Sequence, residues 1–164
     1  KNKDIITLIL GGPTKHYKYT KENIQKIYSK LNNNINKKNL QLVVIPSMRT
    51  PLETIKLAKE YFGTNHLIIE NVDKKAYLSG LSLANFIVVM CDSSSMISEA
   101  ALTGKPIYVA QIPSSKNDYR FKKFRDLFKQ LNIIKELNDN LETWNYERLD
   151  ETNRAAQEIK KKLI

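Results

Sequence analysis

Short apolar segments alternate with longer amphipathic segments along this chain, and this alternation restricts the fold more than any other feature. Strands that are apolar on both faces and separated by helices must pair in parallel, because each right-handed crossover lays a helix on one face of the sheet. The sequence therefore predicts an α/β fold, a Rossmann-like doubly wound parallel sheet in a three-layer αβα arrangement. The apolar runs predict strands at Ile5–Leu10, Leu40–Ile45, His66–Glu70, Phe86–Cys91 and Ile107–Ala110.

Capping residues between these runs indicate where helices begin. Thr20 can cap a helix whose apolar stripe comprises Ile24, Ile27, Tyr28 and Leu31. The tetrapeptide at 50–53, Thr-Pro-Leu-Glu, has the pattern of a capping box with proline at the first helical position, and it predicts a helix to about Phe62 with Gly63 as its stop. Further helices are predicted at 74–84, after residue 92, near 118–131 and at 150–163.

Length and composition fit one domain spanning residues 1–164. No apolar run approaches the roughly 20 residues that span a bilayer, so we expect no transmembrane segment. The single Cys91 excludes an internal disulfide and fits a reducing, cytoplasmic compartment. Because the chain starts at Lys1 and enters a strand-like run by Ile5, we expect it to be part of a longer protein.

The net charge of +10 raises the question of a nucleic-acid partner. Lysine, asparagine and isoleucine are frequent throughout, which indicates a general compositional bias rather than a basic face. Where aromatic residues accompany the positive charges, their helical spacing predicts a stripe that faces the core, leaving the cations outside. The stripe comprises Phe121, Phe124, Phe128 and Leu131, and the cations are Lys122, Lys123, Arg125 and Lys129. We therefore expect no nucleic-acid partner.

Residues 92–106, DSSSMISEAALTGKP, combine a hydroxyl cluster, an acidic residue and a helix stop at a junction between a strand and a helix. The first N–H groups of a helix lack intrahelical partners and carry partial positive charge, so Ser93, Ser94 and Ser95 would surround a seat for a phosphate or carboxylate. Glu99, one turn later, could reach the hydroxyl groups of a ribose. The alternative is ordinary helix capping by serine.

Two further polar loops follow predicted strands, and parallel topology brings all of them to the same sheet edge. In the first loop, Gly11 and Gly12 allow close backbone approach to a ligand and Lys15 offers a charge to a phosphate. In the second, Ser47 precedes Arg49, whose guanidinium can grip a phosphate. The alternatives are a tight turn and solvated cations. The glycine loop matches neither the Walker P-loop nor the dinucleotide fingerprint.

No metal and no cofactor are expected. His16 and His66 stand isolated from carboxylates and from Cys91, and the sequence has no Asp-x-Asp pair that would hold a divalent ion.

Several motifs of the chain resemble those of a known family. GGPTKHY at 11–17, S-x-R-T-P at 47–51, DSxSMxSEAAxTGKP at 92–106, RFxxF at 120–124 and ERLDETNRAAQEI at 147–159 occur in order and resemble the mitochondrial-fission family named for elongated mitochondria in plants. Many bacterial members of that family are labelled as nucleoside-diphosphate-sugar enzymes. The resemblance implies that this chain is the carboxyl-terminal half of such a protein.

More distantly, the layout is similar to the nucleotide-binding lobe of GT-B glycosyltransferases and UDP-N-acetylglucosamine 2-epimerases. This similarity implies one lobe of a GT-B-like fold that binds a nucleotide-diphosphate sugar, with an amino-terminal lobe that would carry most catalytic groups. It implies a diphosphate near Gly11 and Gly12, a base or phosphate near Ser47 and Arg49, and ribose hydroxyl groups at Glu99. The full set of implied nucleotide- and diphosphate-binding residues is Gly11, Gly12, Lys15, Ser47, Arg49, Asp92, Ser93, Ser95, Met96 and Glu99.

The function that these observations favour is donor binding in a glycosyltransferase-like enzyme. One alternative is a non-catalytic interaction domain, because plant members of the family are associated with recruiting a dynamin-related protein to mitochondria. Another is a nucleotide-sugar epimerase. Contact with a membrane surface is compatible with any of these, and catalytic residues are not identified from the sequence.

Overall fold

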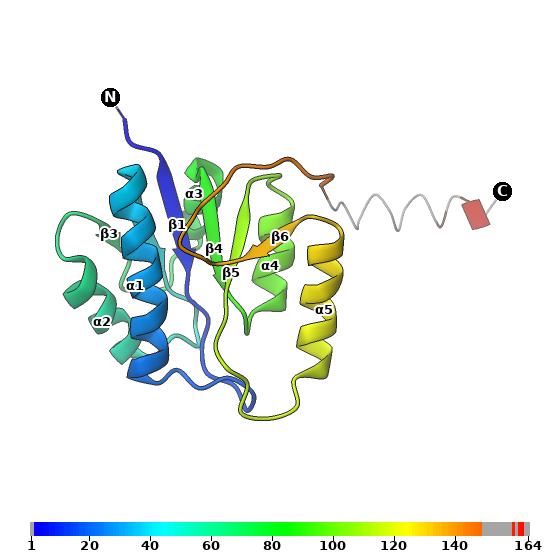
Figure 1. Cartoon of the computed structure of the whole chain (residues 1–164), viewed down its shortest axis with the longest axis horizontal. Helices are drawn as coiled ribbons and strands as arrows, with labels where there is room; N and C mark the ends of the chain where they lie inside the picture. Colours follow the sequence, from blue (N-terminus) through cyan, green and yellow to red (C-terminus); the bar gives the residue numbers. More distant parts are fainter. Residues whose placement is uncertain (1, 149–158, 160, 163–164) are drawn as a thin grey trace.

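A computed structural model describes residues 2–148, 159, 161 and 162 of the chain, and it contains the predicted parallel sheet (Figure 1). Six strands pair in the order β3-β2-β1-β4-β5-β6, and every pairing is parallel. The strands are β1 (Ile5–Ile9), β2 (Gln41–Ile45), β3 (Leu67–Ile68), β4 (Phe86–Met90), β5 (Ile107–Ala110) and β6 (Ile134–Glu136). The helices between them are α1 (Lys21–Lys38), α2 (Leu52–Phe62), α3 (Lys74–Leu83), α4 (Ser94–Ala101) and α5 (Tyr119–Gln130).

The direction of the crossovers reverses at the centre of the sheet. The chain runs outward from β1 to β2 and β3, returns through α3 to place β4 against the other side of β1, and then continues outward to β5 and β6. Helices α1 and α2 consequently cover one face of the sheet, and α3 and α4 cover the other (Figure 1). The loops after β1 and β4 therefore flank the point where ligands bind in sheets of this kind.

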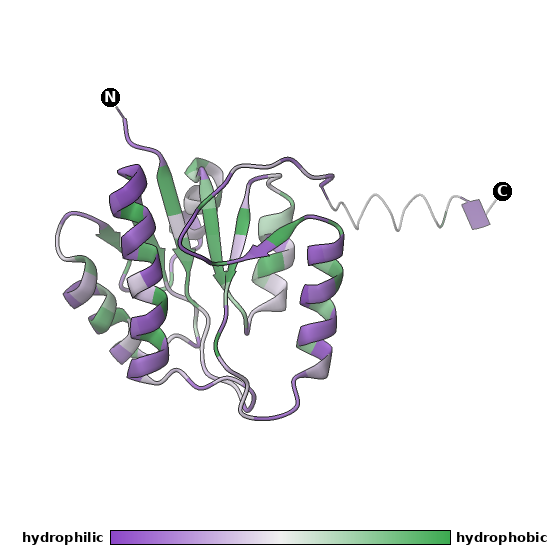
Figure 2. Ribbon diagram, viewed as in Figure 1, coloured by the Kyte–Doolittle hydropathy of each residue, from purple (hydrophilic) through white to green (hydrophobic). Residues whose placement is uncertain are grey.

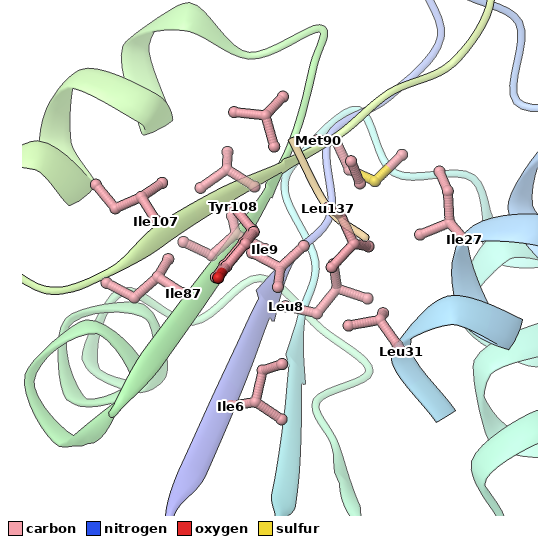
Figure 3. Packing of buried hydrophobic residues seen from close by; sticks show 14 of the residues in the cluster. Ile6, Leu8, Ile9, Ile27, Leu31, Ile87, Met90, Ile107, Tyr108 and Leu137 are labelled. Carbon is pink, nitrogen blue, oxygen red and sulfur yellow. The ribbon is translucent and has the colours of Figure 1, made fainter. Parts of the chain in front are cut away.

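The apolar strands form the core because both faces of the sheet are covered. Every residue of β4 and β5 is buried, and the strands form the apolar centre between helices with polar outer surfaces (Figure 2). Ile27 and Leu31 of α1 lie against the strand side chains, among them Ile6 and Leu8 (Figure 3). Burying side chains of this size, at about 1.5–3 kcal/mol each, supplies most of the favourable free energy of the fold.

The predicted start of α1 is confirmed, whereas the capping box proposed for α2 is wrong. Thr20 is the N-cap of α1, and its hydroxyl accepts a hydrogen bond from the Asn23 N–H at 3.1 Å. Helix α2 begins at Leu52 with Pro51 at the N-cap and without a side-chain cap. The Thr50 hydroxyl instead donates to the Gly11 carbonyl at 2.7 Å, so it joins two loops rather than starting a helix.

Other differences from the sequence-based expectations concern β6, α5 and the residues that follow them. Strand β6 was not predicted, because its Ile-Lys-Glu sequence is short and mostly polar. Arg125, expected outside, is buried, and Leu131, expected in the core, is 47% exposed. The helix predicted at 150–163 falls mostly outside the described residues, of which 159, 161 and 162 are helical.

Candidate functional site

The predicted convergence of three polar loops is observed at the carboxyl ends of β1, β2 and β4. The glycine loop (Gly11–Tyr17) follows β1, the arginine loop (Ser47–Thr50) follows β2, and Asp92 lies between β4 and α4. Hydrogen bonds join all three, since Asp92 accepts from both the Gly12 N–H and the Arg49 guanidinium. The edge of the sheet therefore carries one continuous polar cluster.

Asp92 is the centre of this cluster. Its side chain is fully buried, and its Oδ2 accepts from the Gly12 N–H at 3.1 Å and from Arg49 Nη2 at 3.2 Å. The Tyr19 hydroxyl donates to Oδ1, and burial together with the Asp92 carboxylate raises the pKa of Tyr19 above its ordinary value. A buried carboxylate is tolerated only with such partners. Asp92 thus positions the loops, and its oxygens bond to protein groups rather than face solvent.

Gly11 and Gly12 are required by the protein's own packing. A Cβ atom on Gly11 would lie 2.2 Å from Asp92 Oδ2, and one on Gly12 would lie 2.2 Å from the Arg49 carbonyl oxygen. The sequence pattern correctly indicated a close backbone approach at these positions. It did not indicate that the approaching groups are Asp92 and Arg49.

Part of the Arg49 side chain bonds to the protein, and part is exposed to solvent. Its Nη1 donates to the Gly12 carbonyl at 3.2 Å and its Nη2 to Asp92, yet 48% of the side chain is exposed. Ser47 lies beside it, with its hydroxyl 3.1 Å from the Thr50 hydroxyl. The guanidinium is thereby held in place while part of the side chain is exposed to solvent.

The start of α4 lies at this edge without a side-chain cap. Ser93 is the N-cap residue and is buried, but its hydroxyl makes no capping hydrogen bond. The first bond of the helix runs from the Ile97 N–H to the Ser93 carbonyl at 3.1 Å, so the N–H groups of Ser94, Ser95 and Met96 have no intrahelical acceptor. Ser95 is exposed and Ser94 and Met96 are half-buried. Donors with partial positive charge are therefore left without partners at this edge of the sheet.

Glu99 lies one turn further along α4 and is exposed. The Tyr77 hydroxyl of α3 donates to its Oε2, and burial and this carboxylate both raise the pKa of Tyr77. The contact fixes the carboxylate at the boundary of α3 and α4.

Lys15 is exposed in the glycine loop and lines a groove together with Ser94, the first residue of α4. The sequence did not predict that Arg125, which is bonded to the same loop, is buried. Arg125 of α5 donates to the Tyr17 hydroxyl at 2.9 Å and to Asp118 at 3.2 Å, and the Tyr17 hydroxyl donates to Asp118 at 2.5 Å. This Arg125 cluster, with the bridge between Tyr17 and Ser114, fastens the glycine loop to the loop before α5, and Figure 1 shows the two loops side by side. The spacing of Phe121, Arg125 and Phe128 on one helical face was the available signal.

The described residues contain no group of three or more His, Cys, Asp or Glu side chains that could hold a metal ion. Within the same part of the chain, no helix has both the length and the apolarity to cross a membrane.

The doubly wound sheet with its polar cluster at the reversal of the crossovers is a Rossmann-like α/β fold, and its likeness to solved structures makes it GT-B-like. Two solved structures share this fold: S. aureus MnaA in a co-structure with UDP (TM-score 0.61, 17% identity, 96% of this chain and 36% of that chain), and UDP-GlcNAc 2-epimerase from Neisseria meningitidis bound to UDP-GlcNAc (TM-score 0.55, 16% identity, 97% and 36%). At these identities the likeness shows the fold alone.

The chain belongs to the mitochondrial fission ELM1 family, whose model matches residues 1–163. It is 29% identical to the uncharacterized protein RP120 of Rickettsia prowazekii (strain Madrid E), over 96% of this chain and 46% of that protein. It is 28% identical to the mitochondrial fission protein ELM1 of Arabidopsis thaliana, over 71% of this chain and 28% of that protein. The chain thus spans less than half the length of these relatives.

Proposed function

We propose that this chain is the donor-binding lobe of a GT-B-like glycosyltransferase and that it binds a nucleotide-diphosphate sugar. The observation that carries the proposal is the start of α4, which presents backbone donors at the reversal of the crossovers and has no side-chain cap among the described residues. Helix starts of this kind bind phosphate through both their N–H groups and the helix dipole. The likeness in fold to structures with bound UDP and UDP-GlcNAc supports the same assignment.

In this proposal the residues of the cluster take different roles. The N–H groups of Ser95 and Met96 and the hydroxyls of Ser93 and Ser95 hold the diphosphate, and Glu99 accepts hydrogen bonds from the ribose hydroxyls. The exposed part of Arg49 and the ammonium of Lys15 add positive charge. Asp92, Gly11, Gly12 and Ser47 keep the loops in the required geometry.

The chemistry that follows is stabilisation of a leaving group. As the bond between sugar and diphosphate breaks, negative charge grows on the diphosphate, and fixed donors lower the energy of that charged state. No metal or other cofactor is part of this scheme, because the helix start and the nearby cations supply the positive charge. An amino-terminal lobe of the longer protein would position the acceptor.

Thermal unfolding in the presence of nucleotides tests the proposal. A ligand at about 100 times its dissociation constant adds about 2.7 kcal/mol to the stability of the chain, which in a domain of this size raises the midpoint by roughly 5–10 °C. We expect such a rise with one of UDP, GDP, CMP or ADP at millimolar concentration.

Two variants, one at each residue of the hydrogen-bonded pair Tyr77 and Glu99, make the test more specific. Glu99→Gln should strongly reduce the nucleotide-dependent rise, because an amide binds ribose hydroxyls less well than a carboxylate. Tyr77→Phe removes the hydrogen bond between Tyr77 and Glu99 but leaves the carboxylate, so it should keep most of the rise. Absence of a rise with every nucleotide, or equal effects of the two variants, would contradict the proposal.

A nucleotide-sugar epimerase is the second candidate, favoured by the solved UDP-GlcNAc 2-epimerases of the same fold. The two candidates differ in product. Incubation of the full-length protein with the donor that binds, followed by NMR of the sugar, distinguishes inversion at a ring carbon from loss of the sugar to an acceptor.

A further inference from the structure

A second concave surface lies beside the start of α4, and the proposed diphosphate seat does not use it. This groove, of about 910 Å³, lies between the glycine loop, the first residue of α4 and the beginning of α5. Ser94 belongs to both the groove and the first turn of α4. A group attached to a diphosphate on α4 would therefore reach the groove without leaving the lobe. The residues that line the groove include Lys15, His16, Ser94, Asp118, Arg120 and Phe121.

The charged side chains that line the groove leave it with an excess of positive charge. Lys15 and Arg120 are both exposed on its walls. Among the described lining residues, the one carboxylate is Asp118, which is 3.2 Å from the buried guanidinium of Arg125. Its hydrogen bonds from Tyr17 and Arg125 hold the pKa of Asp118 below its ordinary value, so it remains ionised and its charge is cancelled by Arg125. The groove is left with the two cations uncompensated.

The wall of the groove adds aromatic rings, and one of these rings has a nitrogen that is buried rather than exposed to the groove. His16 packs edge-on against Phe121, with ring centroids 5.2 Å apart. Its Nδ1 is buried and has no hydrogen-bond partner among the described residues, an arrangement that is costly unless a ligand or water supplies one. Apolar walls with a few convergent polar groups are typical of small-molecule sites.

We propose that this groove binds the glycosyl part of the donor and that this glycosyl part carries an acidic group, such as the carboxylate of a uronic acid. The inference rests on the proposed function, because it needs the diphosphate on α4. Arg120 is the residue that forms an ion pair with the acidic group. The proposed function already assigns Lys15 to the diphosphate, so Arg120 is the more specific probe of the groove.

The test compares two donors that differ only at the acidic group. The base is the one that gives the largest midpoint rise; for uracil the pair is UDP-glucose and UDP-glucuronate, titrated into the 164-residue chain by calorimetry at low salt. An exposed ion pair is expected to make the uronate donor bind about fivefold more tightly. Arg120→Gln should remove most of this preference and leave the affinity for the plain nucleoside diphosphate unchanged.

Lys129→Gln is the matched control, since it removes the same charge from the far end of α5, away from the groove. It should leave the preference intact. If no nucleotide binds, the proposed function itself fails. If the nucleoside diphosphate binds but the two donors bind equally, or if the two variants lower the preference equally, the assignment of the groove is overturned.

Discussion

Asp92 shows how one buried residue can constrain the sequence of the loop beside it. Its carboxylate accepts from Gly12, Arg49 and Tyr19, and the space around it leaves no room for a Cβ on Gly11. The glycines at this edge are therefore explained by contacts within the protein, whatever the ligand. Their presence alone is not a sign of phosphate binding.

Gly11→Ala should accordingly destabilise the chain. The added methyl group would lie 2.2 Å from a buried carboxylate oxygen, and relieving such a contact costs on the order of 1–3 kcal/mol. Urea unfolding at neutral pH measures the loss. Gly63→Ala tests the other cause of strain: no described atom crowds the site, but its φ of +64° and ψ of −153° lie in a region essentially restricted to glycine, so it should cost about 1–3 kcal/mol through the backbone alone. A fully stable Gly11→Ala protein would contradict the close contact.

The site could be predicted from the sequence as a location but not as a set of partners. Polar residues after buried parallel strands had to share one sheet edge, and Gly12, Arg49 and Asp92 do meet there. Which of them bond to each other depends on pairs such as Gly12 and Asp92, separated by 80 positions. No local pattern encodes such a pair. For the same reason, the burial of Arg125 against Tyr17 was missed.

The starts of α1 and α4 differ in a way that separates capping from ligand binding. The Thr20 hydroxyl caps α1, whereas the Ser93 hydroxyl makes no capping bond in α4. Thr20→Ala should therefore cost about 1 kcal/mol of stability. Ser93→Ala should cost clearly less in the absence of ligand.

Urea unfolding of both variants checks this difference. The same two proteins, measured with the bound nucleotide, should show the opposite order of effects on the ligand-induced rise in stability, because only Ser93 lies at the proposed seat. Equal costs without ligand would mean that Ser93 acts as an ordinary cap.

Elements with strong local signals were predicted well. The buried runs of β1, β4 and β5 and the apolar stripe of α1 lie where periodicity indicated them. The failures have physical causes. Strand β6 is a three-residue edge strand that is held by pairing with β5 rather than by its own composition. The threonine before α2 fits a capping pattern but forms a tertiary hydrogen bond with Gly11 instead.

The molecule as a whole buries several phenol groups, and this determines how it should respond to alkali. Tyr17 and Tyr28 are fully buried, and burial raises the pKa of each above the ordinary value of 10. Burial likewise raises the pKa of the Cys91 thiol to about 11. These groups stay protonated in the folded chain at pH values where the unfolded chain has already released the protons. Their contribution to stability is therefore complete below the unfolded pKa and is lost as the pH rises through the folded pKa.

We expect the free energy of unfolding to fall steeply above about pH 10, with each buried tyrosine contributing a slope of about 1.4 kcal/mol per pH unit. Urea unfolding between pH 8 and 11 measures the slope. Tyr28→Phe should make it shallower by one tyrosine's share, although it also removes the hydrogen bond from Tyr28 to the Thr54 carbonyl at all pH values. Tyr119→Phe, at a residue that is 64% exposed, should leave the slope unchanged. Identical slopes for all three proteins would refute this account.

The bridge between Tyr17 and Ser114, together with the bonds that Arg125 and Arg49 make, fastens the loops on both sides of the α4 start to the rest of the fold. The conformational entropy of these loops is consequently lost when the chain folds and not when a ligand arrives. A molecule that binds here meets a preorganised surface, so the rate of its association should be set by diffusion and electrostatic attraction rather than by loop rearrangement.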